Sequence, residues 1–360
     1  MNYALQIQRF LLQRDKLASA ADRIAALKQA ISLADANRDI HWGFDLRLEL
    51  IFEEKKTSRC KEGLHAFTWI LDAFDNHPGE FNEDDFLWEY KWMLGSVRRN
   101  SDVSPSLVDS IAEDFKDRLL RNGYSLRPYY SFRVHSAFFL NRLDEAAEMI
   151  EARNKEIRDR MSNCRACELD DDVELEMRRG NFDKAIAAGS EMLTKAVTCK
   201  HMPFSAYCTC MKYFALAGLH DKALEYFLKA ENEFAEMILS DETDTACAVE
   251  ISEMIGFLAG HDREKAWALF EQYAHWNIDS EDFYDFLFSM NVLPLLNDDN
   301  PRTLSVNAAL PWYEAEGSYV PRILYDYYYS IAKTLAEKFD QRHDCDYFSG
   351  RLSRIARFSG

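Results

Sequence analysis

Two short groups of residues near the middle of the chain have the types and spacing of metal ligands. Cys164 and Cys167 form a Cys-x-x-Cys pair, and Cys199 and His201 form a Cys-x-His pair further along. Thiolate sulfur and imidazole nitrogen are ligands that zinc prefers, and a structural zinc ion takes four protein ligands in a tetrahedron. The spacing matches no standard zinc module, so two other roles stay open: a reversible disulfide between Cys199 and the first pair, or packing as small buried residues.

Whether these four residues can meet depends on the helices around them. Apolar residues recur at helical spacing on both sides of a turn in residues 168–198 and again in residues 204–235, which predicts two helical hairpins. The two turns read Gly180-Asn181-Phe182-Asp183-Lys184-Ala185 and Gly218-Leu219-His220-Asp221-Lys222-Ala223. The glycines can take the left-handed conformation that ends a helix. Because the two ends of an antiparallel hairpin lie side by side, we expect the two cysteine-containing pairs to converge as a closed Cys₃His site.

The turn pattern recurs along much of the chain at a nearly constant interval. Its small residue is Ala146, Ala185, Ala223 and Ala266 in successive copies, and upstream Ala66 and Ala26 fall in the same register. The intervals from Ala66 to Ala266 are 80, 39, 38 and 43 residues, and the first equals two periods of forty. Such a period is typical of stacked helical hairpins that bury their apolar faces against their neighbours, and it predicts about seven of them.

Residues 204–235 resemble a repeat of the tetratricopeptide repeat (TPR) family, in which a small residue opens the second helix and large residues pack behind it. The residues at the family's spacing are Tyr207, Met211, Phe214, Gly218, Ala223, Phe227 and Ala230. Residues 168–198 match at the turn and at Ala185. The longer period, against roughly 34 residues in the family, implies longer helices. The resemblance covers residues 20–276 and implies an all-α fold, an α-α superhelix or solenoid, as in uncharacterised bacterial TPR proteins.

The resemblance also implies a binding groove, because the first helices of a TPR stack line its concave surface. Transferred to this chain, the groove positions are His135, Asp170, Glu174, Arg178, Cys208 and Lys212. Arg178 and Lys212 would receive a carboxylate or an acidic peptide, and Asp170 and Glu174 a basic one. The alternative is that these are solvated charges on a helix face. Cys208 would be an alternative metal ligand or a reactive thiol, whereas the neighbouring Cys210 falls at a core position.

Composition and charge limit the partners and the compartment. The chain has 43 Lys and Arg residues against 61 Asp and Glu residues, a formal net charge of −18, which repels nucleic acid and anionic membranes. The N-terminal sequence MNYALQIQRFLLQRDK lacks the unbroken apolar stretch of a signal peptide, and no apolar run is as long as a membrane helix. We therefore expect a cytoplasmic protein, in which eight cysteines favour buried thiols or a metal site over a disulfide framework.

Helical patterns and prolines predict three segments. Residues 1–293 hold the repeats, with helices expected near 2–18, 20–36, 40–56, 61–76, 82–99, 104–121, 127–140, 143–160 and 280–292, besides those of the hairpins above. Residues 294–321 contain four of the eight prolines and should form an irregular connection, because proline blocks helix propagation. Residues 322–360 should form an atypical C-terminal cap of two helices.

The sequence contains none of the motifs GxGxxG, GxxxxGK[ST], GxSxG or HExxH, so it predicts no enzyme and no cofactor other than a structural zinc ion. The first hypothesis is a scaffold or adaptor that binds a protein or peptide partner in the concave groove, in an oligomeric state that the sequence leaves open. One alternative is a regulatory sensor of a signal peptide, resembling bacterial TPR regulators. Another is a scaffold stabilised by zinc or by a redox change at the cysteines.

Overall fold

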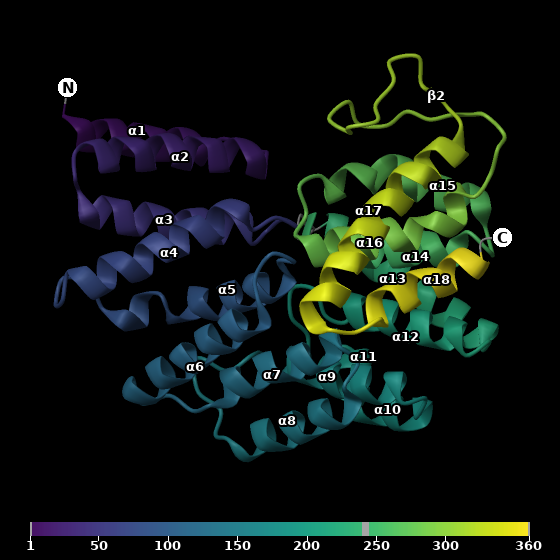
Figure 1. Ribbon diagram of the computed structural model, residues 1–360, viewed down its shortest axis with the longest axis horizontal. Helices are drawn as coiled ribbons and strands as arrows, with labels where there is room; N and C mark the ends of the chain where they lie inside the picture. Colours follow the sequence, from purple (N-terminus) through teal and green to yellow (C-terminus); the bar gives the residue numbers. More distant parts are fainter. Residues whose placement is uncertain (1, 240–244, 359–360) are drawn as a thin grey trace. The chain divides into compact units, whose positions relative to one another are not determined.

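The computed structural model describes residues 2–239 and 245–358, and these are almost entirely helical (Figure 1). They form 18 α-helices, three short 3₁₀ helices and one ribbon of two short strands, which confirms the prediction of an all-α fold. The chain divides into two compact units, Met1–Tyr124 with Asp279–Glu281, and Ser125–Ile278 with Asp282–Gly360. None of the described helices is long and apolar enough to cross a membrane.

In the first unit, successive helices pack against their neighbours in the chain. They are α1 (Tyr3–Arg14), α2 (Ala20–Ala36), α3 (Ile40–Glu54), α4 (Lys61–Asn76), η1 (Glu83–Asp85), α5 (Leu87–Arg99) and α6 (Pro105–Arg121). Ser19, Asp39 and Ser104 cap α2, α3 and α6, because each accepts a hydrogen bond from the backbone N–H three residues further on. Every helix predicted here is present, although α1 is shorter than the pattern predicts and the helix predicted from residue 82 begins as α5 at Leu87, after the separate η1.

The second unit holds the remaining elements. They are α7 (Arg127–Phe139), α8 (Leu143–Lys155), α9 (Arg165–Arg178), α10 (Phe182–Ala188), α11 (Ser190–Leu193), α12 (Phe204–Leu216), α13 (His220–Leu239), η2 (Thr245–Cys247), α14 (Ala248–Leu258), α15 (Arg263–Tyr273), η3 (Ala274–Asn277), α16 (Asp282–Leu296), β1 (Arg302–Thr303), β2 (Ser318–Tyr319), α17 (Pro321–His343) and α18 (Tyr347–Phe358). Most helices again pack against the next helix in the chain.

Three turns of the second unit share one backbone geometry. Asn141, Gly180 and Gly218 take positive φ angles of 55°, 75° and 73°. At each turn the following residue donates its N–H, over 2.9 Å, to the carbonyl oxygen five residues earlier. This is the pattern in which a left-handed residue ends an α-helix, so the helix ends predicted at these turns are confirmed.

The alanines that open the second helices let paired helices approach closely. Ala146, Ala185, Ala223 and Ala266 are all 0% exposed. Because alanine adds a single methyl group at the crossing, the larger side chains on either side can interdigitate. The periodic position of these alanines in the sequence therefore marks real helix contacts.

The second helix of the hairpin that begins with α9 is shorter than its sequence pattern predicts. α10 ends at Ala188, Gly189 follows, and the one-turn helix α11 ends at Leu193. A Cβ atom at Gly189 would lie 2.3 Å from Cγ2 of Val173 on α9, so the backbones approach too closely for a side chain here. The residues after α11 form a loop, and this loop carries Cys199 and His201.

The C-terminal helices pack against the beginning of the second unit. The ring centroid of Phe139, at the end of α7, lies 4.5 Å from that of Phe283 on α16 and 5.2 Å from that of Phe348 on α18. Before α17, residues 297–320 are irregular apart from β1 and β2, which pair antiparallel. α16 runs through Pro294 to Leu296 and so covers the first three residues of the expected connection, and Arg263 donates to carbonyl oxygens at its end.

Candidate metal centre

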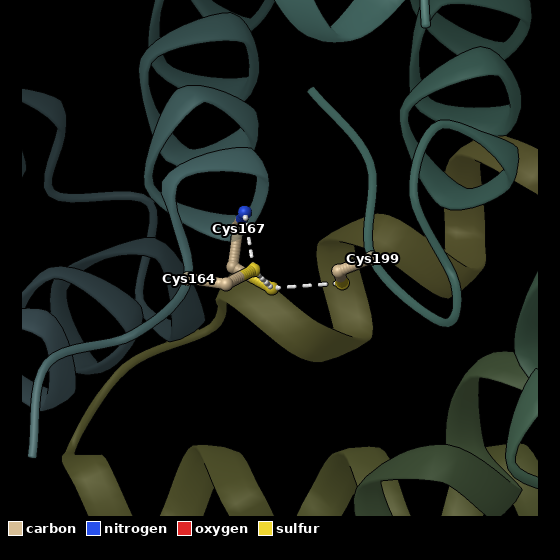
Figure 2. Close-up of side chains that lie close together, drawn as sticks. All are labelled: Cys164, Cys167 and Cys199. Carbon is tan, nitrogen blue, oxygen red and sulfur yellow. Dashed lines mark hydrogen bonds between the residues drawn. The ribbon is translucent and has the colours of Figure 1, made fainter. Parts of the chain in front are cut away.

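Three cysteine side chains converge where α9 begins. The sulfur atoms of Cys164 and Cys167 are 3.2 Å apart, and those of Cys167 and Cys199 are 3.6 Å apart. All three sulfur atoms lie within 4.8 Å of one another, a grouping that could hold a metal ion. Figure 2 shows that the two residues of α9 and the residue of the following loop point toward one another. The expected convergence of the two ends of this hairpin is therefore present for the cysteines.

The backbone around the cysteines fixes their positions. Cys164 is the N-cap residue of α9, and its sulfur accepts a hydrogen bond of 3.4 Å from the backbone N–H of Cys167. Cys199 forms an isolated antiparallel bridge with Met202, in which both backbone N–H groups donate across a tight turn. The helix start and the turn thus present sulfur atoms from two separate segments to one point.

The three thiols differ strongly in their affinity for protons because they lie against one another. The contacts with Cys167 and Cys199 lower the pKa of Cys164 far below its usual range, and backbone N–H groups at the start of α9 add to this effect. The contacts with Cys164 and Cys199, together with burial, raise the pKa of Cys167, and the contact with Cys164 raises that of Cys199. Three neighbouring thiolates repel one another, and a bound metal ion would offset this repulsion.

The spacing of the sulfur atoms suits a tetrahedral metal ion. A Zn–S bond of about 2.3 Å places neighbouring sulfur atoms of a tetrahedron about 3.8 Å apart. The distances of 3.2 and 3.6 Å are close to this value, so small side-chain movements would seat the ion. A disulfide would require an S–S distance of about 2.05 Å. All eight cysteines are free thiols in the structure.

Packing alone gives a poor account of this cluster. Cys164 is exposed, and Cys167 and Cys199 are only partly buried, whereas cysteines that serve as small apolar residues are usually fully buried. The neighbouring Cys208 and Cys210 follow that second pattern, since both are 0% exposed. The partly exposed position of the cluster favours a chemical role for its sulfur atoms.

His201, the fourth ligand expected from the sequence, is not among the groups that meet at this point. Over the described part of the chain, the donor atoms that gather here belong to three cysteines alone. The turn between Cys199 and Met202 carries the imidazole toward α14. Burial raises the pKa of Glu250 on that helix, and the nearby His201 opposes the rise. The structure therefore assembles a Cys₃ group rather than the expected Cys₃His set.

Most charged residues expected to line a groove contact other residues of the second unit. His135 Nε2 lies 2.8 Å from Asp171 Oδ1. Arg178 pairs with Glu174 and also donates to the backbone oxygen of Phe138 over 2.9 Å, which links α9 to α7. Lys212 Nζ lies 2.6 Å from Glu253 Oε1, which links α12 to α14. These charges act as contacts between first helices of successive hairpins, rather than as freely solvated groups.

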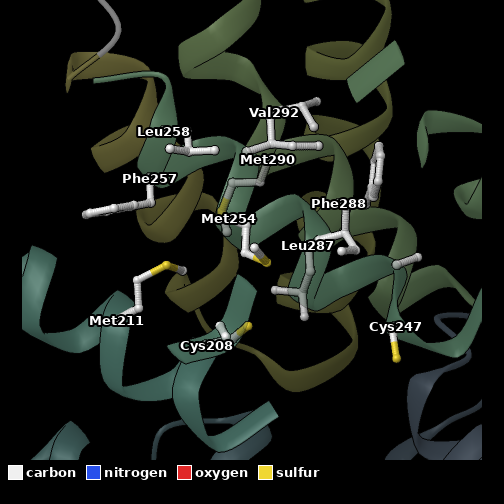
Figure 3. Packing of buried hydrophobic residues seen from close by; sticks show 14 of the residues in the cluster. Cys208, Met211, Cys247, Met254, Phe257, Leu258, Leu287, Phe288, Met290 and Val292 are labelled. Carbon is white, nitrogen blue, oxygen red and sulfur yellow. The ribbon is translucent and has the colours of Figure 1, made fainter. Parts of the chain in front are cut away.

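Cys208 and Asp170, also expected in the groove, are enclosed by the helices around them. Cys208 belongs to the buried cluster that includes Met254 and Leu287 (Figure 3), and burial raises its pKa well above the usual value. It is therefore a neutral core thiol, not the exposed groove residue that the resemblance implied. Asp170 Oδ1 is buried and has no hydrogen-bond partner among the described residues. Burial and the charges of Glu174, Asp171 and Glu250 raise the pKa of Asp170 well above its usual value.

Two buried arginines, not predicted from the sequence, position α9. Arg153, 0% exposed, pairs with Asp171, and Arg127 pairs with Glu168, the residue after Cys167. A signal for Arg153 exists, because it continues the buried face of α8 formed by Ala146 and Ile150 at intervals of four and three residues. A charged residue on such a face predicts a buried partner.

Comparisons with known proteins do not assign the chain to a family. No protein-family model matches this sequence. No curated protein matches it significantly either.

Proposed function

We propose that this chain is a non-enzymatic cytoplasmic adaptor, an α-α superhelix of the TPR type that binds a protein or peptide partner. The observation that carries the proposal is the recurrence of one hairpin junction at Asn141, Gly180 and Gly218, each followed by a fully buried alanine. Stacked hairpins of this kind present rows of side chains from their first helices over an extended surface.

Charge favours a partner with basic groups. The side chain of Glu174 is 24% exposed and its pKa is lowered by Arg178 and Lys212, so its carboxylate can face such a group, whereas burial raises the pKa of Asp170 and Glu250. The formal net charge of −18 acts in the same direction over longer distances. Charge of this kind governs the choice of partner and the association rate more than the final affinity.

The second part of the proposal is a zinc ion bound by Cys164, Cys167 and Cys199. It would fasten the start of α9 to the loop after α11, which otherwise has little regular structure. The convergence of the three sulfur atoms within 4.8 Å supports this role. Thiolate sulfur suits zinc, whose tetrahedral geometry matches the observed spacing.

Two measurements test these parts separately. Elemental analysis of the purified protein should find zinc near one equivalent, and less than about 0.1 equivalent would rule out the metal.

Affinity purification should recover a partner with the wild-type chain and less of it with Glu174→Gln. Glu151→Gln, which changes a carboxylate on the exposed face of α8, serves as the control. Equal recovery with all three chains would eliminate the named surface as the binding site.

A further inference from the structure

The cysteine centre supplies one ligand fewer than a closed structural zinc site. Such sites hold zinc with four protein ligands, whereas the open sites known from zinc enzymes have three protein ligands and an exchangeable water or substrate in the fourth position. Within residues 2–239 and 245–358, the His, Cys, Asp and Glu side chains whose donor atoms gather here are Cys164, Cys167 and Cys199. The described part of the chain thus supplies three ligands, the number found in zinc sites with an open fourth position.

Two polar residues beside the cysteines in the sequence are held by other contacts. Glu168 follows Cys167, but its carboxylate pairs with Arg127 and Arg158, and its side chain is 2% exposed. His201 lies near Glu250 on α14. To reach the sulfur atoms, Glu168 would have to leave Arg127 and Arg158, and His201 would have to move away from Glu250.

The centre is accessible from outside the chain. Cys164 is exposed at the first turn of α9, and Cys167 and Cys199 are partly buried behind it. The side chain of Arg165, the next residue along, is 52% exposed. A donor atom from another molecule can therefore approach the ion on the side of Cys164.

Charge indicates which donor would take that position. A divalent zinc ion with three thiolates carries a net charge of −1. A fourth thiolate would make it −2 in a chain whose formal charge is already −18, and like charges repel. A neutral imidazole nitrogen adds no charge and is a ligand that zinc prefers. Histidine is therefore the donor best matched to this centre.

We propose that zinc at Cys164, Cys167 and Cys199 keeps its fourth position open to an external imidazole, the histidine side chain of a partner. Water holds the position in the free protein. On binding, the water leaves, and the lone pair of a neutral imidazole nitrogen forms the new bond to zinc, with no change of oxidation state. This inference rests on the zinc ion of the proposed function and adds a partner residue to it.

Cobalt substitution tests the inference on the full-length chain. Cobalt(II) accepts the same ligands as zinc, and its visible absorption bands depend on the ligand set. We expect cobalt bands that change on titration with imidazole and reach a plateau. A parallel titration with 2-mercaptoethanol should change them far less. His201→Ala should have the wild-type bands before imidazole is added.

The outcomes separate the possible failures. Cobalt bands that do not respond to imidazole would overturn the open position while leaving the metal in place. A stronger response to the thiol than to imidazole would overturn the choice of donor. Altered bands in His201→Ala would identify His201 as the fourth ligand and overturn the inference. A complete lack of cobalt bands would instead remove the zinc ion of the proposed function.

Discussion

Arg127 and Glu168 form a two-point ion pair, with Nε–Oε1 and Nη2–Oε2 distances of 2.8 Å each. Their side chains are 6% and 2% exposed, so both charges are removed from solvent. Arg127 lies at the start of α7, and Glu168 follows Cys167 on α9. The pair therefore anchors the helix turn that carries two of the three metal-site cysteines.

Glu168→Gln should destabilise the second unit because it leaves the buried charge of Arg127 without its partner. Removing one member of a buried ion pair costs about 3–5 kcal/mol in the free energy of unfolding. Chemical denaturation followed by circular dichroism measures this change. Glu151→Gln is the control, because Glu151 and Lys155 form an ion pair whose side chains are both 71% exposed. A similar result for the two variants would contradict the anchoring role of Glu168.

Loss of a single cysteine of the centre should lower both zinc content and thermal stability. A metal ion that binds only the folded state raises the free energy of unfolding. The increase is about 4 kcal/mol when the free metal concentration is a thousand times the dissociation constant. Cys199→Ser should therefore melt several degrees below the wild type and lose its response to a chelator. Cys345→Ser, which changes an exposed cysteine between α17 and α18, should behave as the wild type. A chelator-insensitive wild-type melting temperature would speak against a stabilising metal.

The sequence predicted those features of the fold that depend on local spacing. The positive φ angles at Asn141, Gly180 and Gly218 follow from residue types that tolerate them, and the buried alanines follow from the period. The cysteines meet because hairpin ends lie together. Each of these features needs only a short stretch of sequence and a simple geometric rule.

Features that depend on contacts between distant segments could not be predicted from the sequence. The contact of Phe139 with helices α16 and α18 joins residues more than a hundred positions apart, and no local pattern indicates it. Likewise, Cys208 is buried in a cluster with Met254 of α14 and Leu287 of α16 rather than exposed in a groove. Residue spacing also could not show that the imidazole of His201 lies apart from the three sulfur atoms.

Asp170→Asn should stabilise the protein, and more so as the pH rises. Burial and nearby carboxylates raise the pKa of Asp170 in the folded state. The folded state therefore holds this proton more tightly than the unfolded state, and its contribution to stability is lost as the pH rises through the folded-state pKa. Each unit of pKa rise corresponds to about 1.4 kcal/mol at high pH. Unfolding curves at several pH values from 4 to 8 give the difference between the variant and the wild type.

Glu174→Gln should change stability in the opposite direction to Asp170→Asn. Although burial acts to raise its pKa, the charges of Arg178 and Lys212 lower it overall. The carboxylate of Glu174 therefore contributes stability above its unfolded-state pKa and loses it as the pH falls. We expect Glu174→Gln to destabilise the protein at pH 8 and to matter least in acid. Parallel pH dependence of the two variants would show that Asp170 and Glu174 do not differ in their charge state.

Gly189→Ala should destabilise the second unit through one identified overlap. The added methyl group would lie 2.3 Å from Cγ2 of Val173, although the backbone at Gly189, with φ −88° and ψ 5°, accepts alanine. Overpacking of this kind costs about 1–3 kcal/mol in the free energy of unfolding. The double variant Gly189→Ala/Val173→Ala removes the overlap and should be at least as stable as Val173→Ala alone.

Gly180→Ala is the matched control. It adds a methyl group in open space at φ +75°, so adding Val173→Ala should not restore the stability that Gly180→Ala loses. The prediction is wrong if the free energy of unfolding lost in the double variant equals the sum of the losses in Gly189→Ala and Val173→Ala. Such additivity would mean that Val173 does not limit the size of the side chain at residue 189.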